Sequence, residues 1–286
     1  MERRRFLKTA AIAPLAAGTL AAPAIAQSAY RWRMANLYPR GISFGVAYEG
    51  FAERVASASG GRLVIENVYD GEGVSATEVF AAVKSGLVEM GSPYMALHAG
   101  ELAAGVVELG LPGGPERYDQ LYALWAAGGW KEALAEAYAS QGIRHLGSIM
   151  QPGVYLLTKA PVNSLADLRG MKLRAPGAYG AFMRELGVAP VTMAFAEVYT
   201  SLATGAIDGC CSSNLIDYRD GKWYEQAKYL YPVPVSGAQA SPTIVNQAAF
   251  DSLPDDLKSV LEVANIEHCF AHVTLAIATV DRKSVV

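Results

Sequence analysis

One arginine of this sequence stands where a strand is predicted to end. Arg174 lies near the end of the apolar segment 171–175 and is followed closely by a Pro-Gly break at 176–177. Open α/β folds bind ligands at the carboxyl ends of their strands, and a guanidinium offers a planar pair of donors to a carboxylate. Arg174 is therefore a candidate carboxylate ligand. The alternative is an arginine that reaches solvent or pairs with an acidic side chain.

A pair of histidines and a glycine-rich turn have spacings that occur in metal sites and in dinucleotide-binding sites, respectively. His268 and His272 are four residues apart on a predicted helix, with Cys269 beside them, so both could face one metal ion. No third ligand stands at a recognisable spacing, which favours packed histidines. The turn 71–76 has the form Gly-x-Gly-x-x-Ala, but Glu72 inside it would repel a phosphate. We expect neither a metal nor a cofactor.

The three cysteines are Cys210, Cys211 and Cys269. Adjacent cysteines pair with each other only under strain, and an odd number leaves at least one free. No histidine lies close to positions 210–211 in the sequence to act as a base. GxSxG, HExxH and paired-carboxylate signatures are also missing from the sequence. We expect free, buried cysteines and a protein that is not an enzyme.

Composition excludes several other classes. The chain has 286 residues, with 24 Lys and Arg against 27 Asp and Glu, a formal charge of -3. Nucleic-acid binding needs a clustered basic surface, so no nucleic-acid partner is expected. Hydrophobic residues make up 52% and charged residues 18%, which is too apolar for a disordered chain. The length fits one large or two modest domains.

The first 26 residues have the form of a secretory signal peptide. Arg3, Arg4 and Arg5 precede a short apolar stretch that ends in Ala-Ile-Ala at 24–26. The order Arg-Arg-x-Phe-Leu-Lys resembles a twin-arginine signal, which is an export address and not an anchor. We therefore expect a periplasmic mature protein that begins near Gln27. An uncleaved membrane anchor is the alternative.

The last six residues, 281–286, are polar and interrupt a helical pattern. One back-translation of this hexapeptide reproduces the start of a common sequencing adapter. We expect a non-native tail after a truncated C-terminus, with a natural short tail as the alternative.

Alternating helix and strand patterns indicate an α/β fold. Strands are predicted at 30–38, 63–69 and 87–93, with helices at 44–58 and 75–85 between them. This β-α-β-α-β order favours a parallel sheet with helices on its faces. Farther along, helices are predicted at 118–141, 179–186, 195–204 and 257–280, and strands at 144–150, 153–158, 171–175, 188–192, 206–212, 228–235 and 241–246.

Three stretches, 164–176, 195–209 and 222–230, resemble the substrate-binding proteins of TRAP transporters, the tripartite ATP-independent periplasmic type, in their DctP branch. The likeness extends to 60–63, 78–86 and 246–257, and so covers nearly the whole mature chain. The resemblance implies two α/β lobes around a hinge cleft, each a mainly parallel sheet flanked by helices. Residues 27–150 plus 239–280 are expected to form lobe 1 and residues 151–238 lobe 2.

The resemblance also implies a set of ligand contacts. The family's carboxylate-binding arginine falls on Arg174, and a second polar contact falls on the strand that includes Ser212 and Asn214. A glutamine at the start of the second lobe matches Gln151, and Tyr155 lies close to it.

Three further contacts follow from the predicted strands of the first half. Asn36 and Tyr38 lie at the end of the first predicted strand and Tyr94 directly after the third, and these strands should end at the cleft. One family branch holds a metal ion near a Glu-Trp pair, and this chain has Cys211 and Ser212 there instead, so we expect no metal.

The function that the resemblance implies is a periplasmic receptor. It would bind a small organic acid through Arg174 and deliver it to the small and large membrane subunits of a TRAP-type transporter. An exported enzyme of unknown chemistry, or the receptor of an ATP-driven importer, is the alternative.

Overall fold

The computed structural model describes residues 29–280. The predicted signal peptide and the predicted non-native tail lie outside this range. The first half contains β1 (Tyr30–Asn36), α1 (Ser43–Ala58), β2 (Leu63–Val68), α2 (Val79–Ser85), β3 (Met90–Ser92), the 3-10 helix η1 (Met95–His98), α3 (Ala103–Leu109), α4 (Tyr118–Ala127), α5 (Trp130–Ala139) and β4 (Ile143–Gln151).

The second half begins with a strand that follows β4 almost directly. It contains β5 (Val154–Thr158), η2 (Leu165–Leu168), β6 (Lys172–Arg174), α6 (Gly177–Glu185), β7 (Ala189–Val191), η3 (Phe195–Glu197), α7 (Val198–Thr204), β8 (Gly209–Ser213), α8 (Leu215–Asp220), η4 (Trp223–Glu225), β9 (Tyr229–Ser236), β10 (Gln239–Asn246), α9 (Gln247–Ser252) and α10 (Asp255–Val280).

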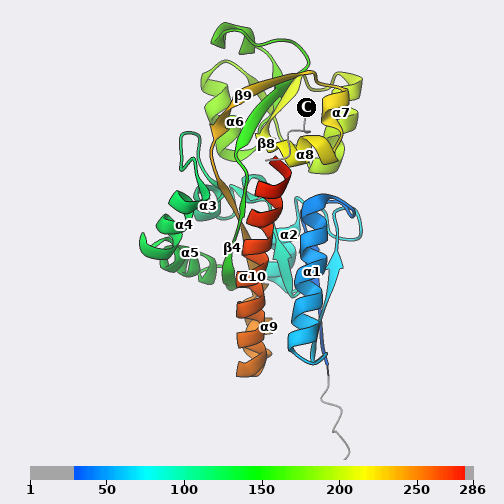
Figure 1. The fold of residues 1–286 in the computed structure, drawn as a ribbon, viewed down its shortest axis with the longest axis vertical. Coiled ribbons are helices and arrows are strands. Elements are labelled where there is room, and N and C mark those ends of the chain that lie inside the picture. Colours follow the sequence, from blue (N-terminus) through cyan, green and yellow to red (C-terminus); the bar gives the residue numbers. More distant parts are fainter. Residues whose placement is uncertain (1–28, 281–286) are drawn as a thin grey trace, which may run out of the picture.

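Two separate sheets form the cores of two lobes. The first has the strand order β2-β1-β3-β10-β4 and the second β7-β6-β8-β5-β9. In Figure 1 the second sheet and its helices form the upper lobe, and the first sheet forms the lower one. The two-lobed α/β architecture expected from the sequence is confirmed.

Each sheet is mixed, whereas mainly parallel sheets were expected. β1 pairs in parallel with β2 and β3, and β6 with β7 and β8, but the remaining pairings are antiparallel. The reason is the chain path between the lobes. β10 returns from the second lobe and therefore runs against β3 and β4, and β5 leaves the region where β8 ends and runs against it.

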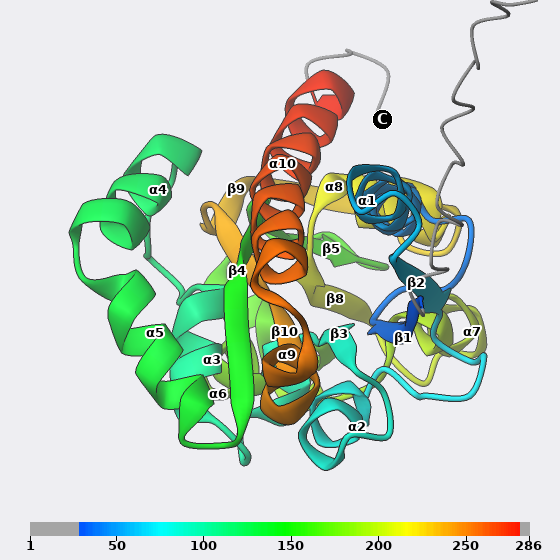
Figure 2. The same cartoon turned by 90° about the horizontal axis from the view of Figure 1, so that it is seen from below.

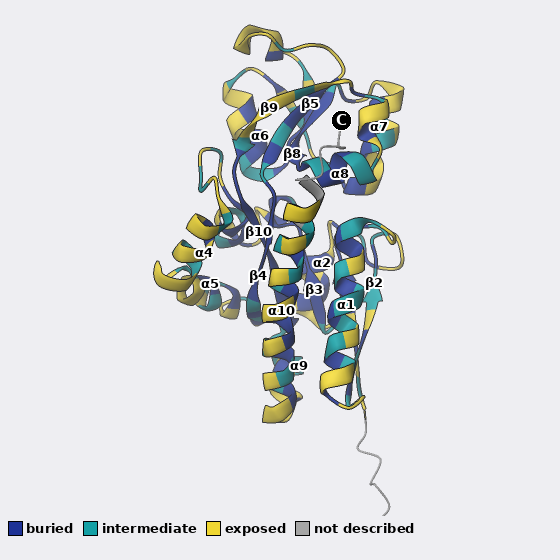
Figure 3. Ribbon diagram, in the orientation of Figure 1, coloured by how far each residue is buried: buried dark blue, intermediate teal, exposed yellow. Residues whose placement is uncertain are grey.

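The long helix α10 connects the lobes on the outside. It packs on β4 and α1 in the first lobe, and it also contacts α8 of the second. Seen from below, α4 and α5 lie on one side of β4 and α1 on the other (Figure 2). Both α1 and α10 are exposed on their outer faces and buried on their inner faces (Figure 3).

The helix expected over 118–141 is two helices, α4 and α5. The break falls at Gly128 and Gly129, and Gly129 has a φ of 80°, in the left-handed region that glycine adopts at little cost. The sequence pattern gave no sign of α3 or η1. Among residues 29–280, no helix combines the length and the apolarity that crossing a membrane requires.

Candidate functional site

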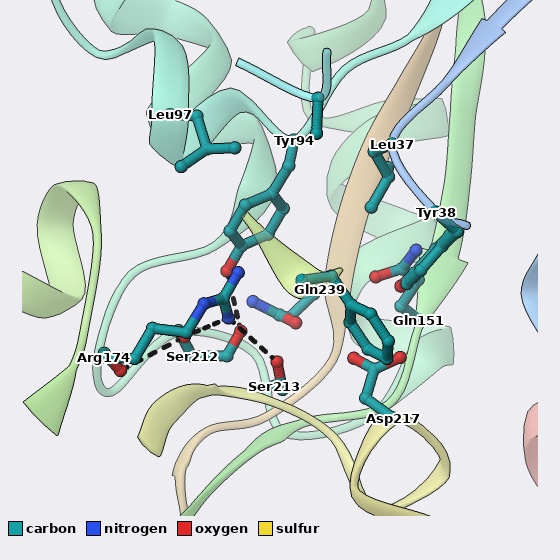
Figure 4. Close-up of a pocket in the computed structure, with 12 residues that line it drawn as sticks. Leu37, Tyr38, Tyr94, Leu97, Gln151, Arg174, Ser212, Ser213, Asp217 and Gln239 are labelled. Carbon is teal, nitrogen blue, oxygen red and sulfur yellow. Dashed lines mark hydrogen bonds between the residues drawn. The ribbon is translucent and has the colours of Figure 1, made fainter. Parts of the chain in front are cut away.

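A small cavity lies between the two lobes, and both contribute to its wall. Its volume is about 20 Å³, room for about one water molecule. Any larger ligand therefore requires the lining side chains or the lobes to move apart. The residues that line it are Leu37, Tyr38, Ala76, Tyr94, Leu97, Gln151, Arg174, Phe195, Ser212, Ser213, Asp217 and Gln239 (Figure 4).

Strand ends bring these residues together. Tyr38 and Tyr94 follow β1 and β3, which are parallel neighbours, so their carboxyl ends meet at one edge of the first sheet. Arg174 ends β6, and its backbone is in register with Cys210 of the parallel strand β8, which ends at Ser213. Facing edges of two sheets thus form the cavity, as expected for ligand sites in open α/β folds.

The two strands that cross between the lobes supply a further part of the wall. Gln151 ends β4 and Gln239 begins β10, and the two residues are directly paired in the antiparallel ladder. Gln239 donates a hydrogen bond of 2.7 Å to the Tyr179 hydroxyl. The Nε2 of Gln151 is buried and has no hydrogen-bond partner among the described residues.

Arg174 is buried, with 3% of its surface exposed. Its Nε donates to the Met193 carbonyl at 3.1 Å, and its Nη1 donates to the hydroxyls of Ser212 at 2.7 Å and Ser213 at 3.2 Å. All three partners are neutral. Within residues 29–280, no carboxylate lies within 4.0 Å of its guanidinium. A buried cation that makes no direct ion pair is costly, so this site is suited to an anion.

Aromatic rings surround that cation. The guanidinium carbon lies 6.0 Å from the ring centre of Tyr94 and 5.9 Å from that of Trp223, at the edge of cation–π range. The Tyr94 hydroxyl donates to the Ser212 carbonyl at 2.9 Å, which is a direct bond between the lobes. Burial raises the pKa of Tyr94 well above its ordinary value, so this hydroxyl stays protonated and remains a donor.

A carboxyl group lies in the same cavity wall. Asp217, on α8, is 4% exposed. Its Oδ2 accepts a 3.0 Å hydrogen bond from Asn214 Nδ2, whereas no group among the described residues meets hydrogen-bond distance and angle to its Oδ1. Burial raises the pKa of Asp217 to about 7, although the Asn214 backbone N–H and the charge of Arg174 both act to lower it. The Tyr38 hydroxyl lies beside this carboxyl group and acts on it as a hydrogen-bond donor, which also lowers the pKa of Asp217.

The residues predicted from sequence fall into two groups. Five line the cavity: Tyr38, Tyr94, Gln151, Arg174 and Ser212.

The other three, Asn36, Tyr155 and Asn214, do not line it. Asn36 donates to Asn67 Oδ1 at 3.0 Å inside the first lobe. The Tyr155 carbonyl accepts from Tyr218. Asn214 is the N-cap of α8, where its side chain accepts from the backbone N–H groups of Ile216 and Asp217.

Sequence reasoning missed Asp217, Gln239, Phe195 and the apolar wall. A signal for Asp217 was available, because Asn214 and Asp217 have the spacing of a capping box and so predict a helix that starts directly after a strand. An acidic residue in that first turn lies close to the strand end. No pattern of neighbouring residues could have predicted the pairing of Gln239 with Gln151, because the two residues are distant in the sequence.

The other chemical candidates are accounted for by packing. His268 and His272 are buried, and their ring centres lie 5.0 Å and 5.4 Å from that of Tyr48. Cys210 and Cys211 are buried and Cys269 is partly buried, and none of them forms a disulfide. Across the described part of the chain, no three metal-ligating side chains form a cluster.

Fold and cavity together define a two-lobed binding protein with an anion-accepting site between its lobes. Residues 36–277 match the model of the bacterial extracellular solute-binding protein family 7, the DctP family, and the chain belongs to this family. It is therefore a solute-binding receptor and not an enzyme. Proteins of this family are periplasmic, bind small organic acids and work with TRAP membrane components.

Individual relatives agree with this assignment. The chain is 30% identical to a monocarboxylate 2-oxoacid-binding periplasmic protein from a Nostoc species, over 93% of this chain and 76% of the relative. A marine metagenome TRAP solute-binding protein specific for pyroglutamate has a TM-score of 0.81 at 27% identity, covering 90% of this chain and 84% of that one. A TRAP protein from Pseudoalteromonas atlantica with bound sodium and pyruvate has a TM-score of 0.81 at 29% identity, covering 89% and 79%.

Proposed function

We propose that this receptor binds a small monocarboxylate whose carboxylate group pairs with Arg174. The observation that carries the proposal is the environment of the guanidinium, which is buried between the lobes and bonded only to neutral oxygens. A ligand carboxylate would supply the direct ion pair that Arg174 does not make within the described residues. The unpartnered Nε2 of Gln151 is a further donor in the same wall. Relatives that bind pyruvate or pyroglutamate suggest the size of the ligand.

Binding and release require the lobes to open and close. We assign residues 27–150 plus 239–280 to one lobe and 151–238 to the other, with hinges where β4 continues into β5 and β9 into β10. Closure would remove water from the cavity and strengthen each charged contact, because the local dielectric constant falls.

The bound acid would then pass to the small and large membrane subunits of a TRAP transporter.

Residues 1–26 would direct export, and Arg3 and Arg4 form the twin-arginine pair. Replacing both with Lys should leave the precursor in the cytoplasm, as cell fractionation would detect. Normal periplasmic yield from that variant would exclude the twin-arginine route.

The central test is the affinity of the Arg174→Ala variant for small carboxylates. A thermal-shift screen of the mature protein identifies an acid that stabilises it, because a ligand bound only by the folded state raises the melting temperature. Calorimetry then compares variants. We expect Arg174→Ala to lose about 3–5 kcal/mol of binding free energy, as when one partner of a buried ion pair is removed.

Arg169→Ala is the matched control, since Arg169 is exposed on the same lobe. It should bind as the wild type does. An Arg174→Ala protein that folds and binds with wild-type affinity would remove Arg174 from the site.

A further inference from the structure

Asp217, in the same lobe as Arg174, presents a hydrogen-bond acceptor to the cavity. Asp217 is held by the N-cap of its own helix, because its Oδ2 accepts from Asn214 and its backbone N–H donates to the Asn214 side chain. This fixes the direction of the carboxyl group. The other oxygen, Oδ1, is buried, and no group among the described residues meets hydrogen-bond distance and angle to it, although the Tyr38 hydroxyl acts on the same carboxyl group as a donor. Asp217 belongs to the cavity wall (Figure 4). Buried polar atoms are rarely left unpaired.

The cavity is therefore asymmetric in its hydrogen-bonding chemistry. Arg174 and Gln151 bring donors, which suit a carboxylate, whereas Asp217 brings an acceptor, which suits an O–H or N–H group. Leu37, Leu97 and Phe195 line the apolar remainder and would contact a carbon skeleton.

We propose that Asp217 accepts a hydrogen bond from the ligand, so that the receptor selects small carboxylates that carry a hydroxyl or amide N–H donor over the corresponding 2-oxo acids. This inference rests on the proposed binding of a carboxylate at Arg174. A 2-oxo group offers only an acceptor. Its oxygen lone pairs would face those of the Asp217 carboxylate, and no hydrogen bond could form between them. Sites built around such a hydrogen bond discriminate strongly against analogues that lack the matching group.

The charged and titratable groups around Asp217 support this assignment and predict a pH dependence of ligand affinity. The groups that face it are Arg174 on β6, Tyr38 after β1, Tyr94 after β3, and Asn214 and Asp220 beside it on or next to α8. Burial raises the pKa of Asp217 to about 7, so the group is close to half-ionised at neutral pH. A ligand donor favours the carboxylate form. Affinity for a hydroxy acid should therefore rise as the pH increases through 7, and affinity for a 2-oxo acid should fall.

The experiment compares matched ligand pairs by calorimetry. The probes are lactate against pyruvate, and 2-hydroxyisovalerate against 2-oxoisovalerate, with both enantiomers of each hydroxy acid and with pyroglutamate as a cyclic amide. The wild type should bind one enantiomer of a hydroxy acid, or pyroglutamate, at least about tenfold more tightly than the 2-oxo acids. This preference should be larger at about pH 8 than at about pH 6, because Asp217 is then ionised.

Asp217→Asn is the diagnostic variant. The amide can still accept from Asn214 through its oxygen, and it places an NH2 donor where Oδ1 was. The preference for hydroxy acids should disappear or reverse, and the pH dependence should disappear with it. Glu185→Gln, at an exposed acid near the end of α6 in the same lobe, is the control. It should leave both the affinities and the preference unchanged.

The outcomes separate the two proposals. If the wild type binds 2-oxo acids as tightly as hydroxy acids, or more tightly, and Asp217→Asn keeps that ranking, this inference is wrong while the role of Arg174 stands. If the folded wild type binds none of the carboxylates, both proposals fail. If carboxylates bind but Arg174→Ala does not weaken them, the proposed function fails on its own evidence.

Discussion

The carboxylate of Asp220 on α8 accepts a hydrogen bond of 2.8 Å from the backbone N–H of Ser43, the first residue of α1. The two helices belong to different lobes. The N-cap residue of α1 is Ile42, which has no side-chain acceptor, and the first N–H groups of a helix need outside partners. Arg219 adds a 2.9 Å bond from its Nη2 to the Ser43 hydroxyl. A helix of the first lobe is thus capped by the second.

This cap should stabilise the closed form. Asp220→Ala removes it, and loss of an N-cap costs about 1 kcal/mol. Because closure accompanies binding, we expect an affinity loss of about fivefold for every ligand, measured by calorimetry. Glu53→Ala, at an exposed acid on α1, should have no such effect. Wild-type affinity in Asp220→Ala would show that the bond contributes nothing to closure.

Asp217 should lower the stability of the ligand-free protein at neutral pH. Its pKa is about 7 when folded, chiefly because of burial, and about 3.9 when unfolded. Below both values the group is neutral in both states and has no effect. As the pH rises from about 4 to 7, the unfolded chain releases its proton first, so the free energy of unfolding falls by about 4 kcal/mol.

Asp217→Asn removes this penalty. In urea unfolding without ligand, the variant should be more stable than the wild type at about pH 8, and the difference should shrink towards about pH 4. Identical pH profiles for the two proteins would mean that Asp217 ionises as freely in the fold as in water. A gain in stability together with altered ligand preference would mark Asp217 as a residue kept for binding.

The histidine pair between α1 and α10 should make the fold sensitive to acid. Burial, followed by the charge of Arg54, lowers the pKa of His272 to about 3, and burial lowers that of His268 well below its ordinary value. In the folded protein both imidazole rings therefore stay neutral at pH values below about 6.5, where the histidines of the unfolded chain already take up protons. The contribution of the two histidines to the free energy of unfolding is therefore fully present above about pH 6.5 and is lost as the pH falls below that value.

His272→Phe should reduce that sensitivity. The ring of His272 stacks on Phe44 with centres 5.3 Å apart, so a phenyl group preserves the contact without titrating. Between about pH 6.5 and 5 the wild type should lose about 2 kcal/mol more unfolding free energy than the variant, as measured in urea. An equal loss in both proteins would assign the acid sensitivity to other groups.

Local patterns predicted the elements that depend on local geometry. The apolar spacing from Phe44 predicted a helix over 44–58, and α1 runs from Ser43 to Ala58. Arg174 was predicted at a strand end and is the last residue of β6. The same patterns joined α4 and α5 into one helix, because the spacing of apolar residues continues through Gly128 and Gly129 and does not report the left-handed backbone between them.

The amino-acid sequence by itself determined the family, the alternation of helices and strands, and the presence of an arginine suited to a carboxylate. These depend on residue types and spacings within short segments. Only the tertiary structure decided that Gln239 lies opposite Gln151, that Asn214 caps a helix, and that Asp217 joins Arg174 in one cavity. Those relationships depend on strand register and on how the two lobes meet. Contacts between segments that are distant in the sequence produce no regular spacing of residue types from which they could be predicted.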